Sequence, residues 1–314
     1  MLKIRNRWFA AGCVALLLGT PSPGRAEADP ESGPPAGLHL PDISPGGSGE
    51  IPPVPETMSL RADAEQFGYT SRFLFRRLFN PSHRAATWWS LGGLLGASAV
   101  LEHNKNGLQS NLLEHSNEET DEVFATSKIL GNAGIVPGIG MLLFLQGKIF
   151  SQPQVHETGL MVLESALYTA IFTEAGRFIL AEQRPDEGGD MKFFQSSGHG
   201  ISGHASIAAS IAAPLSRGLF GIDPDDGRWS RFGKRFGTGV AYSLPVLTGL
   251  SRIEDNRHYA WNVALGLTLG FAVGNTVADA HDEAAEVRTS RWRPDSVGPL
   301  FSDQGRGLAL RWRF

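Results

Sequence analysis

Residues 236–278 of this 314-residue chain read FGTGVAYSLPVLTGLSRIEDNRHYAWNVALGLTLGFAVGNTVA. In this stretch a short polar segment separates two apolar ones, Phe236–Leu250 and Tyr259–Ala278. Neither apolar segment alternates apolar and polar residues as a half-buried strand does, and each is long enough for several helical turns. The stretch therefore predicts two helices joined by a polar turn, with Arg252 ending the first helix and His258 beginning the second.

Apolar segments of the same kind precede this pair. They are Thr87–Leu101, Ile129–Gly147, Thr158–Leu180 and His204–Leu219. Their spacing suits helices joined by short or medium loops, and Arg61–Asn80 adds an amphipathic helix that mixes phenylalanine with arginine. We expect an all-α fold, a helical bundle with about six core helices, over residues 57–285.

The N-terminus is typical of a secretory signal peptide. Three basic residues precede an apolar run, and Gly24 and Ala26 supply small residues before a cleavage site. Cleavage would remove residues 1–26 and with them Cys13, the only cysteine, so thiolate and disulfide chemistry are not expected. A membrane anchor is the alternative, but the apolar run is short for a span. We expect export, to a bacterial periplasm.

The segments that flank the bundle differ from it in composition. Residues 27–56 are rich in proline, glycine and acidic residues and predict a flexible linker. The tail, residues 286–314, ends in Gly307–Phe314, which alternates apolar and other residues as the last strand of an outer-membrane barrel does. A barrel needs at least about eight strands, so we expect a short terminal strand or hairpin and leave outer-membrane association open.

Overall composition excludes one class of partner. With 28 basic and 32 acidic residues, the chain lacks the positive charge of a general nucleic-acid-binding protein. Ile129–Gly147 and Tyr259–Ala278 carry no charge and approach spanning length. Because the mean hydropathy of the chain is only −0.12, a soluble or peripherally bound bundle is slightly favoured over an integral membrane protein.

Two further polar clusters interrupt the apolar pattern. In the first, Arg177 and Arg184 are seven residues apart, so both would lie on one face of a helix that Pro185 ends. Two guanidiniums on one side form a clamp for a phosphate group. Taken alone, two arginines on one helix are more often a solvated face.

The second cluster contains two Ser-Gly-His triplets, at 197–199 and 202–204. Ser202 and Gly203 would begin a long helix, where free backbone N–H groups and the helix dipole favour a bound phosphate. The Ser202 side chain would also cap that helix. For His199, which precedes the helix, an exposed loop histidine is the stronger interpretation.

In the polar turn of the opening stretch, His258 and Asn262 are four residues apart and share a helix face. A histidine oriented by such a partner can act as a nucleophile toward phosphorus. A helix-capping histidine beside a polar loop is the plain alternative, which any one cluster by itself would favour.

Together and in order, the clusters form the pattern Arg-x6-Arg-Pro, Ser-Gly-His and Ser-Arg-x5-His-x3-Asn. This pattern resembles the signature of the type-2 phosphatidic acid phosphatase superfamily, which includes bacterial acid phosphatases and vanadium-dependent haloperoxidases. The resemblance covers about Thr158–Ala278. It implies a helical bundle and a phosphatase reaction through a phosphohistidine, with a phosphate-ester or lipid-phosphate substrate and with neither metal nor cofactor.

Carried over by position, the resemblance makes His258 the nucleophile and His204 the general acid that protonates the leaving oxygen. The remaining matched residues would hold the phosphoryl oxygens: Arg177, Arg184, Ser202, Gly203 and Arg252. These roles agree with the chemistry, because negative charge develops on those oxygens in the transition state.

Three positions depart from the family pattern. Arg177 stands where lysine is typical, and Ile201 stands where proline precedes Ser-Gly-His. The serious change is Asn262, which stands where an aspartate orients the nucleophilic histidine. An amide brings no charge to stabilise imidazolium, and the corresponding change in a serine protease costs about 10⁴ in kcat. Glu254 and Asp255 are near enough in sequence to be candidates for compensation.

This departure keeps two alternatives open. The first is a non-catalytic protein that binds phosphate or lipid phosphate through a degenerate site. A vanadium haloperoxidase ranks last, because the chain is short for that branch.

Overall fold

The computed structural model describes residues 58–79, 100–114, 127–196, 198–291, 296–302 and 305–311. All of them belong to one of the two compact units of the chain, Val54–Phe314. The expected signal peptide, the linker and most of Thr87–Leu101 lie outside the described residues.

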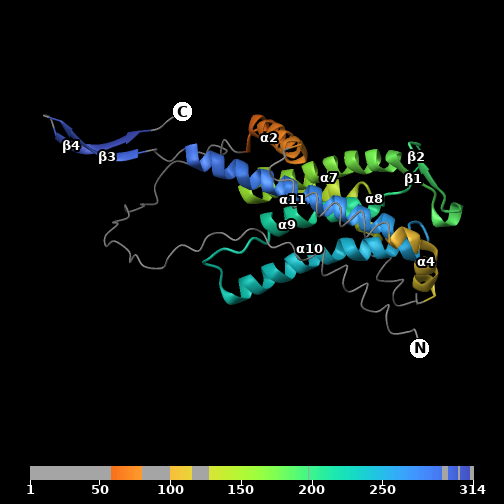
Figure 1. The fold of residues 1–314 in the computed structure, drawn as a ribbon. Helices are drawn as coiled ribbons and strands as arrows, with labels where there is room; N and C mark the ends of the chain where they lie inside the picture. The colour runs from red at the N-terminus through yellow and green to blue at the C-terminus, as the bar shows by residue number, and fades with distance from the viewer. Residues whose placement is uncertain are drawn as a thin grey trace. The chain divides into compact units, whose positions relative to one another are not determined.

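The described part of the chain is helical, with two short antiparallel hairpins (Figure 1). The helices are α2 (Leu60–Phe79), α4 (Lys105–Leu113), η3 (Lys128–Gly131), α6 (Ile135–Ile149), α7 (Pro153–Ile179), η4 (Pro185–Glu187), α8 (Gly203–Ser210), α9 (Ala212–Gly218), α10 (Arg228–Glu254) and α11 (Ala260–Arg291). Strand β1 (Leu180–Glu182) pairs with β2 (Met191–Phe193), and β3 (Ser296–Ser302) pairs with β4 (Gly305–Arg311). The all-α fold class and the C-terminal hairpin are confirmed.

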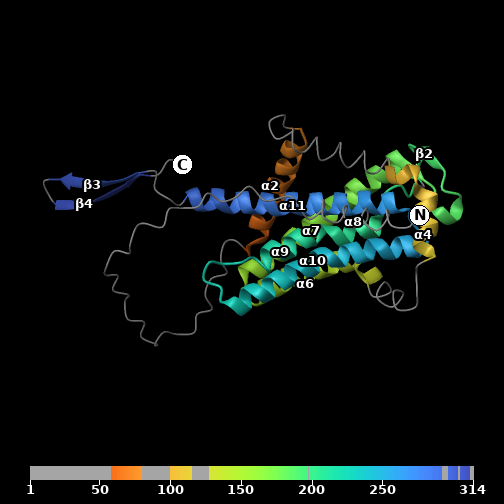
Figure 2. The same ribbon diagram turned by 60° about the horizontal axis from the view of Figure 1, so that its bottom comes forward.

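Helix α8 lies inside the bundle, packed against α7, α10 and α11 (Figures 1 and 2). Most of its residues are small, and glycines of α11 lie directly over its backbone. A Cβ on Gly270 would stand 2.1 Å from the carbonyl oxygen of Ser206, and one on Gly266 would stand 2.5 Å from that of Ser202. Small residues let helix backbones approach this closely, and the approach places the start of α11 beside the start of α8.

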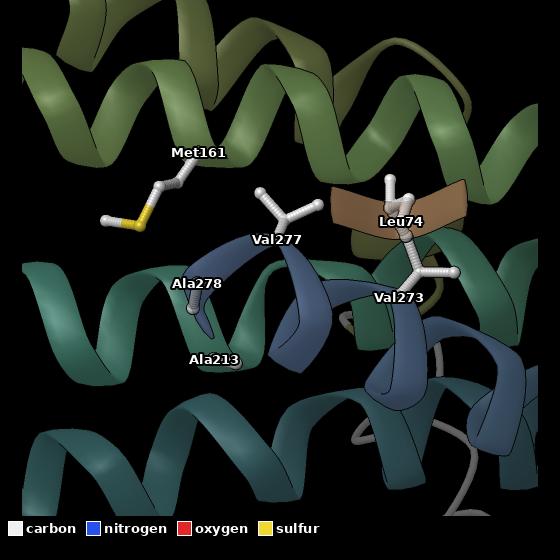
Figure 3. Packing of buried hydrophobic residues seen from close by; sticks show 6 residues of the cluster. All are labelled: Leu74, Met161, Ala213, Val273, Val277 and Ala278. Carbon is white, nitrogen blue, oxygen red and sulfur yellow. The ribbon is translucent and has the colours of Figure 1, made fainter. Parts of the chain in front are cut away.

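One buried apolar cluster joins α2, α7, α9 and α11. Its members are Leu74, Met161, Ala213, Val273, Val277 and Ala278. In Figure 3, Val273 lies against Leu74, and the side chain of Met161 extends from α7 toward α11. The helix expected over Arg61–Asn80 is confirmed as α2, but its buried face is not the expected apolar one. Besides Leu74 it buries Asp63, Gln66 and Thr70, whereas Phe67 and Phe75 stay exposed.

The long helix expected from His204 to Leu219 is interrupted at Ile211, between α8 and α9. Pro214 gives a physical reason, because it has no N–H to donate to the carbonyl group of Ser210, four residues earlier. The Ser210 hydroxyl donates within its own turn, to the carbonyl oxygen of Ile207 (2.8 Å).

A second helix prediction was also wrong. The helix that carries Arg177 ends at Ile179 and does not reach Pro185, so Arg177 and Arg184 do not share a helical face. The next three residues, Leu180–Glu182, pair with β2 instead, and this non-local pairing competes with the helical bonds that the spacing had suggested.

Among the described helices, one segment, Ala260–Val287 of α11, is long and apolar enough to cross a membrane. Half of its most apolar window is buried inside the protein, as is also typical of a core helix.

Candidate active site

The three polar clusters meet at one end of the bundle, where α7 ends, α8 begins and α10 turns into α11 (Figure 1). Backbone and side-chain hydrogen bonds join them. Arg177 Nε donates to the carbonyl oxygen of Ile201 (3.0 Å), and the Ser202 N–H donates to that of Asn262 (3.1 Å). Within the turn, the His258 N–H donates to the carbonyl oxygen of Arg252 (3.2 Å). Segments that are far apart in sequence thus form one site.

The His258 imidazole is the most perturbed group of this site. The residue is 5% exposed, and its Nδ1 has no hydrogen-bond partner among the described residues. Burial lowers its pKa to about 3, and the positive charges of Arg177, Arg252 and Arg184 act in the same direction. His258 is therefore neutral at pH 7, with a lone pair available on the ring.

Polar donors around His258 lack partners within the described chain. They are the Nε atoms of Arg184 and Arg252 and the hydroxyl of Ser202, all fully shielded. A buried polar group without a partner costs about 1–3 kcal/mol, so a cluster of them points to a ligand that bonds to them. Because two of the three belong to cations, the donors fit an oxyanion.

Arg177 lies over the start of α8. A Cβ on Gly203 would stand 2.4 Å from Arg177 Nη2, so only glycine leaves room for the guanidinium there. The opposite amino group, Nη1, donates to Glu174 (2.7 Å). The cation and the first N–H groups of α8 are thus placed side by side, which favours an anion at that point.

Ser202 stands at the N-cap of α8, but its side chain makes no capping bond. The expected cap is therefore absent. The buried hydroxyl of Ser202 has no hydrogen-bond partner among the described residues.

His204, in the first turn of α8, is half-buried and packs on Gly131. Burial lowers its pKa, the charges of Arg252 and Arg177 lower it further, and Asp255 partly opposes them. An anion held between these cations would reverse their effect and favour the protonated imidazole.

His199 is not the exposed loop histidine that the sequence favoured. It is half-buried, and its ring centroid lies 6.4 Å from that of His258. Burial and the charges of Arg184 and Arg177 lower its pKa. The duplicated Ser-Gly-His triplet was the sequence signal that could have identified it.

Asn262 does not orient the His258 ring through a hydrogen bond, as had been expected. Its Oδ1 accepts from the N–H of Tyr259 (2.8 Å), and its Nδ2 donates to Glu182 (2.7 Å) and to the carbonyl oxygen of Gly200 (3.0 Å). Asp255, which the sequence suggested as a carboxylate that compensates for Asn262, forms ion pairs with Arg252 and Lys128.

Sequence reasoning missed two residues behind the site, Glu182 and Lys105. Glu182 is fully buried, and Lys105 Nζ donates to its Oε1 (2.8 Å) and to the carbonyl oxygen of Gly189 (2.8 Å). Burial raises the pKa of Glu182, while the bonds from Lys105 and Asn262 oppose the shift. No motif includes Lys105, so no sequence signal could have paired it with Glu182.

A mostly apolar cavity of about 470 Å³ opens beside Arg177, Gly203 and His204. Its other lining residues come from the segment before α6 and from α6, α7 and α8: Gly131, Ala133, Pro137, Leu163, Ala166, Leu167, Ala170, Thr173, Glu174 and Ile207. The site therefore has a cationic end and an adjoining apolar groove.

Residues 159–285 match the sequence model of the PAP2 superfamily. The chain carries a PAP2 superfamily domain. The match contains all the candidate residues from Arg177 to Asn262. Lys105 and Gly131 lie outside it, although both touch the site.

Among solved structures, the chain is similar to the crystal structure of a transmembrane PAP2-type phosphatidylglycerolphosphate phosphatase from Bacillus subtilis. The two share 16% sequence identity with a TM-score of 0.43, over 74% of this chain and 98% of that one. No curated protein matches the chain.

Proposed function

We propose that this protein is a phosphatase that hydrolyses phosphate monoesters through a phosphohistidine at His258. The observation that carries the proposal is a buried, neutral imidazole surrounded by the arginines 177, 184 and 252. A neutral ring supplies the attacking lone pair, and the cations stabilise charge on the transferred group.

In the first step a nitrogen of His258 attacks phosphorus, and an N–P bond forms while the P–O ester bond breaks. His204 gives its proton to the leaving oxygen, and the product alcohol departs. A water molecule then attacks the phosphohistidine, gives a proton to His204 and releases inorganic phosphate as the N–P bond breaks. Arg184, Arg252 and Ser202 bond to the phosphoryl oxygens throughout.

The apolar groove favours lipid phosphates over small soluble esters. It begins at His204 and Arg177, where the phosphate would be held, and is lined by Leu163, Leu167 and Ile207. Helices α6 and α7 also expose apolar side chains: Met141, Leu142, Leu145, Ile149, Leu167, Ile171 and Phe178. An exposed apolar surface of this kind suits a membrane, so we place the protein at a membrane, on the periplasmic side if the N-terminal segment is cleaved after Ala26.

The test compares purified wild type with His258→Ala on phosphatidate in mixed micelles and on an aryl phosphate. We expect turnover of both substrates by wild type, a higher kcat/KM for phosphatidate, and loss of both activities in the variant. Substrate labelled with ³²P should leave acid-labile label on wild type only. His103→Ala, at an exposed position, is the matched control. Equal release of phosphate by wild type and His258→Ala would disprove the proposal.

One observation favours a second candidate, a phosphate-binding protein without turnover. The Nδ1 atom of His258 has no partner among the described residues, so no carboxylate stabilises an imidazolium there. Binding of inorganic phosphate with no hydrolysis of either substrate would identify this function.

A further inference from the structure

The side chain of Asn262 connects all three polar clusters. Through Glu182 it reaches the first cluster, and through the Gly200 carbonyl oxygen it reaches the second. Its third bond, from the Tyr259 N–H, closes the turn that carries His258. Asn262 is 2% exposed, so water does not compete for these bonds.

Glu182 completes the same network from the other side. Its backbone carbonyl oxygen accepts from the N–H of His199 (2.8 Å), and its carboxylate accepts from Lys105 and from Asn262. Each oxygen of this fully buried carboxylate thus has a donor, one of them a cation. A buried charge is tolerated when it is paired and hydrogen-bonded in this way.

We propose that Glu182 and Asn262 form a matched carboxylate–amide pair that positions the three clusters around His258. The negative charge that the family pattern places at position 262 stands at position 182 in this chain. Asn262 is accordingly a positioning residue, and an aspartate there would be harmful. The activity part of this inference rests on the proposed function, whereas its stability part does not.

The geometry gives the reason. With aspartate at position 262, one oxygen would still accept from the Tyr259 N–H. The other would face the Glu182 carboxylate at about the 2.7 Å of the present bond, and it would also face the Gly200 carbonyl oxygen, an acceptor. Two carboxylates that share a site cannot both ionise without a large cost, so the pKa of one of them rises.

Thermal unfolding of the full-length chain in mild detergent tests whether a carboxylate at position 262 is destabilising beside Glu182. Asn262→Asp should have a Tm several degrees below wild type at pH 8, and the difference should shrink at pH 5, where one of the two carboxyls takes up a proton. Lys105 and Tyr259, the other titratable groups facing Glu182, stay protonated over this range because their pKa values are raised. Asn275→Asp is the matched control. It places the same charge on the same helix beside Arg217, and its Tm should not fall.

A second variant keeps the test decisive if Asn262→Asp does not fold. Glu182→Gln/Asn262→Asp exchanges the two groups and restores one amide and one carboxylate. We expect it to recover much of the Tm lost in Asn262→Asp, as coupled neighbours do. An Asn262→Asp protein as stable as wild type at pH 8, or no recovery in the double variant, would overturn the proposal.

Activity gives the second readout. Because a small misplacement of reacting groups can cost about 100-fold, Asn262→Asp should lose kcat/KM for phosphatidate by up to about that factor, and the double variant should regain part of it. A gain of activity in Asn262→Asp would overturn the proposal that Glu182 and Asn262 form a matched pair. If wild type itself is inactive, the proposed function fails. The Tm values then still test whether Glu182 and Asn262 form a matched pair.

Discussion

Two buried histidines, His258 just before α11 and His281 in its C-terminal half, show how neighbouring groups decide the charge of a buried side chain. His258 is 5% exposed and His281 is 2% exposed. Burial lowers the pKa of His258 to about 3, in the presence of arginines. Burial also disfavours a positive charge on His281. Hydrogen bonds to Glu157 and Glu164 outweigh the effect of burial and raise the pKa of His281 to about 9. Similar burial therefore gives a neutral ring in one place and a cation in the other.

The surroundings of the two rings also differ in hydrogen bonding. Both nitrogens of His281 contact carboxylates, at 3.3 Å to Glu157 and 3.2 Å to Glu164. A second buried histidine near this end, His156, is likewise bonded to Asp63 (2.8 Å). Around His258, in contrast, donors and the ring itself lack partners in the described chain. The first region has the features of a structural network and the second those of a binding site.

The largest effect is expected when a cation beside His258 is removed, because the site then loses one of the charges that distinguish it from the surroundings of His281. We expect Arg252→Ala to lower kcat/KM by about 10²–10³, the usual cost of losing one donor to a charged transition state. The pKa of His258 should rise at the same time, because one of the positive charges that lower it is gone. Kinetics together with an NMR titration of the histidines measure both effects. Arg257→Ala, at an exposed position, is the control, and an equal loss of activity there would argue against a specific role for Arg252.

The pH profile of kcat/KM should show the lowered pKa values directly, because kcat/KM reports the free enzyme. The nucleophile His258 must be neutral, so activity falls only as the pH approaches about 3. The acid His204 must be protonated, and its pKa is lowered below the usual 6.5. We expect an acidic optimum, with about a tenfold fall per pH unit on the alkaline side. His204→Gln should remove the alkaline fall. An optimum above pH 7 would contradict this assignment.

The smallest effect is expected at His281, on stability alone. Its folded pKa is raised, so the stabilisation is complete below the unfolded value near 6.5 and is lost as the pH rises through about 9. The contribution is on the order of 3 kcal/mol. His281→Gln should therefore lower the Tm clearly at pH 6 and much less at pH 9.5, with phosphatase kinetics little changed. A Tm difference independent of pH would show that His281 is not charged in the folded protein.

Much of the fold followed from local sequence. Apolar segments without alternation predicted the helices, and the three clusters predicted a candidate site from segments that the fold brings together. The predictions that went wrong concern places where a non-local contact competes with the local preference. The Leu180 N–H still donates to Gly176 at the end of α7, but Leu180 also pairs with Phe193 in a strand, and the chain leaves the helix there. Spacing alone therefore placed Arg184 on the wrong element.

The sequence by itself determined the helical class, the three basic clusters and their order along the chain, because periodicity and spacing are local properties. Tertiary structure alone decided the partner of Asn262. Glu182 lies 80 residues away from it, and Lys105 lies another 77 residues before Glu182. A buried carboxylate needs its donors wherever packing brings them, and no local pattern records which residues those are.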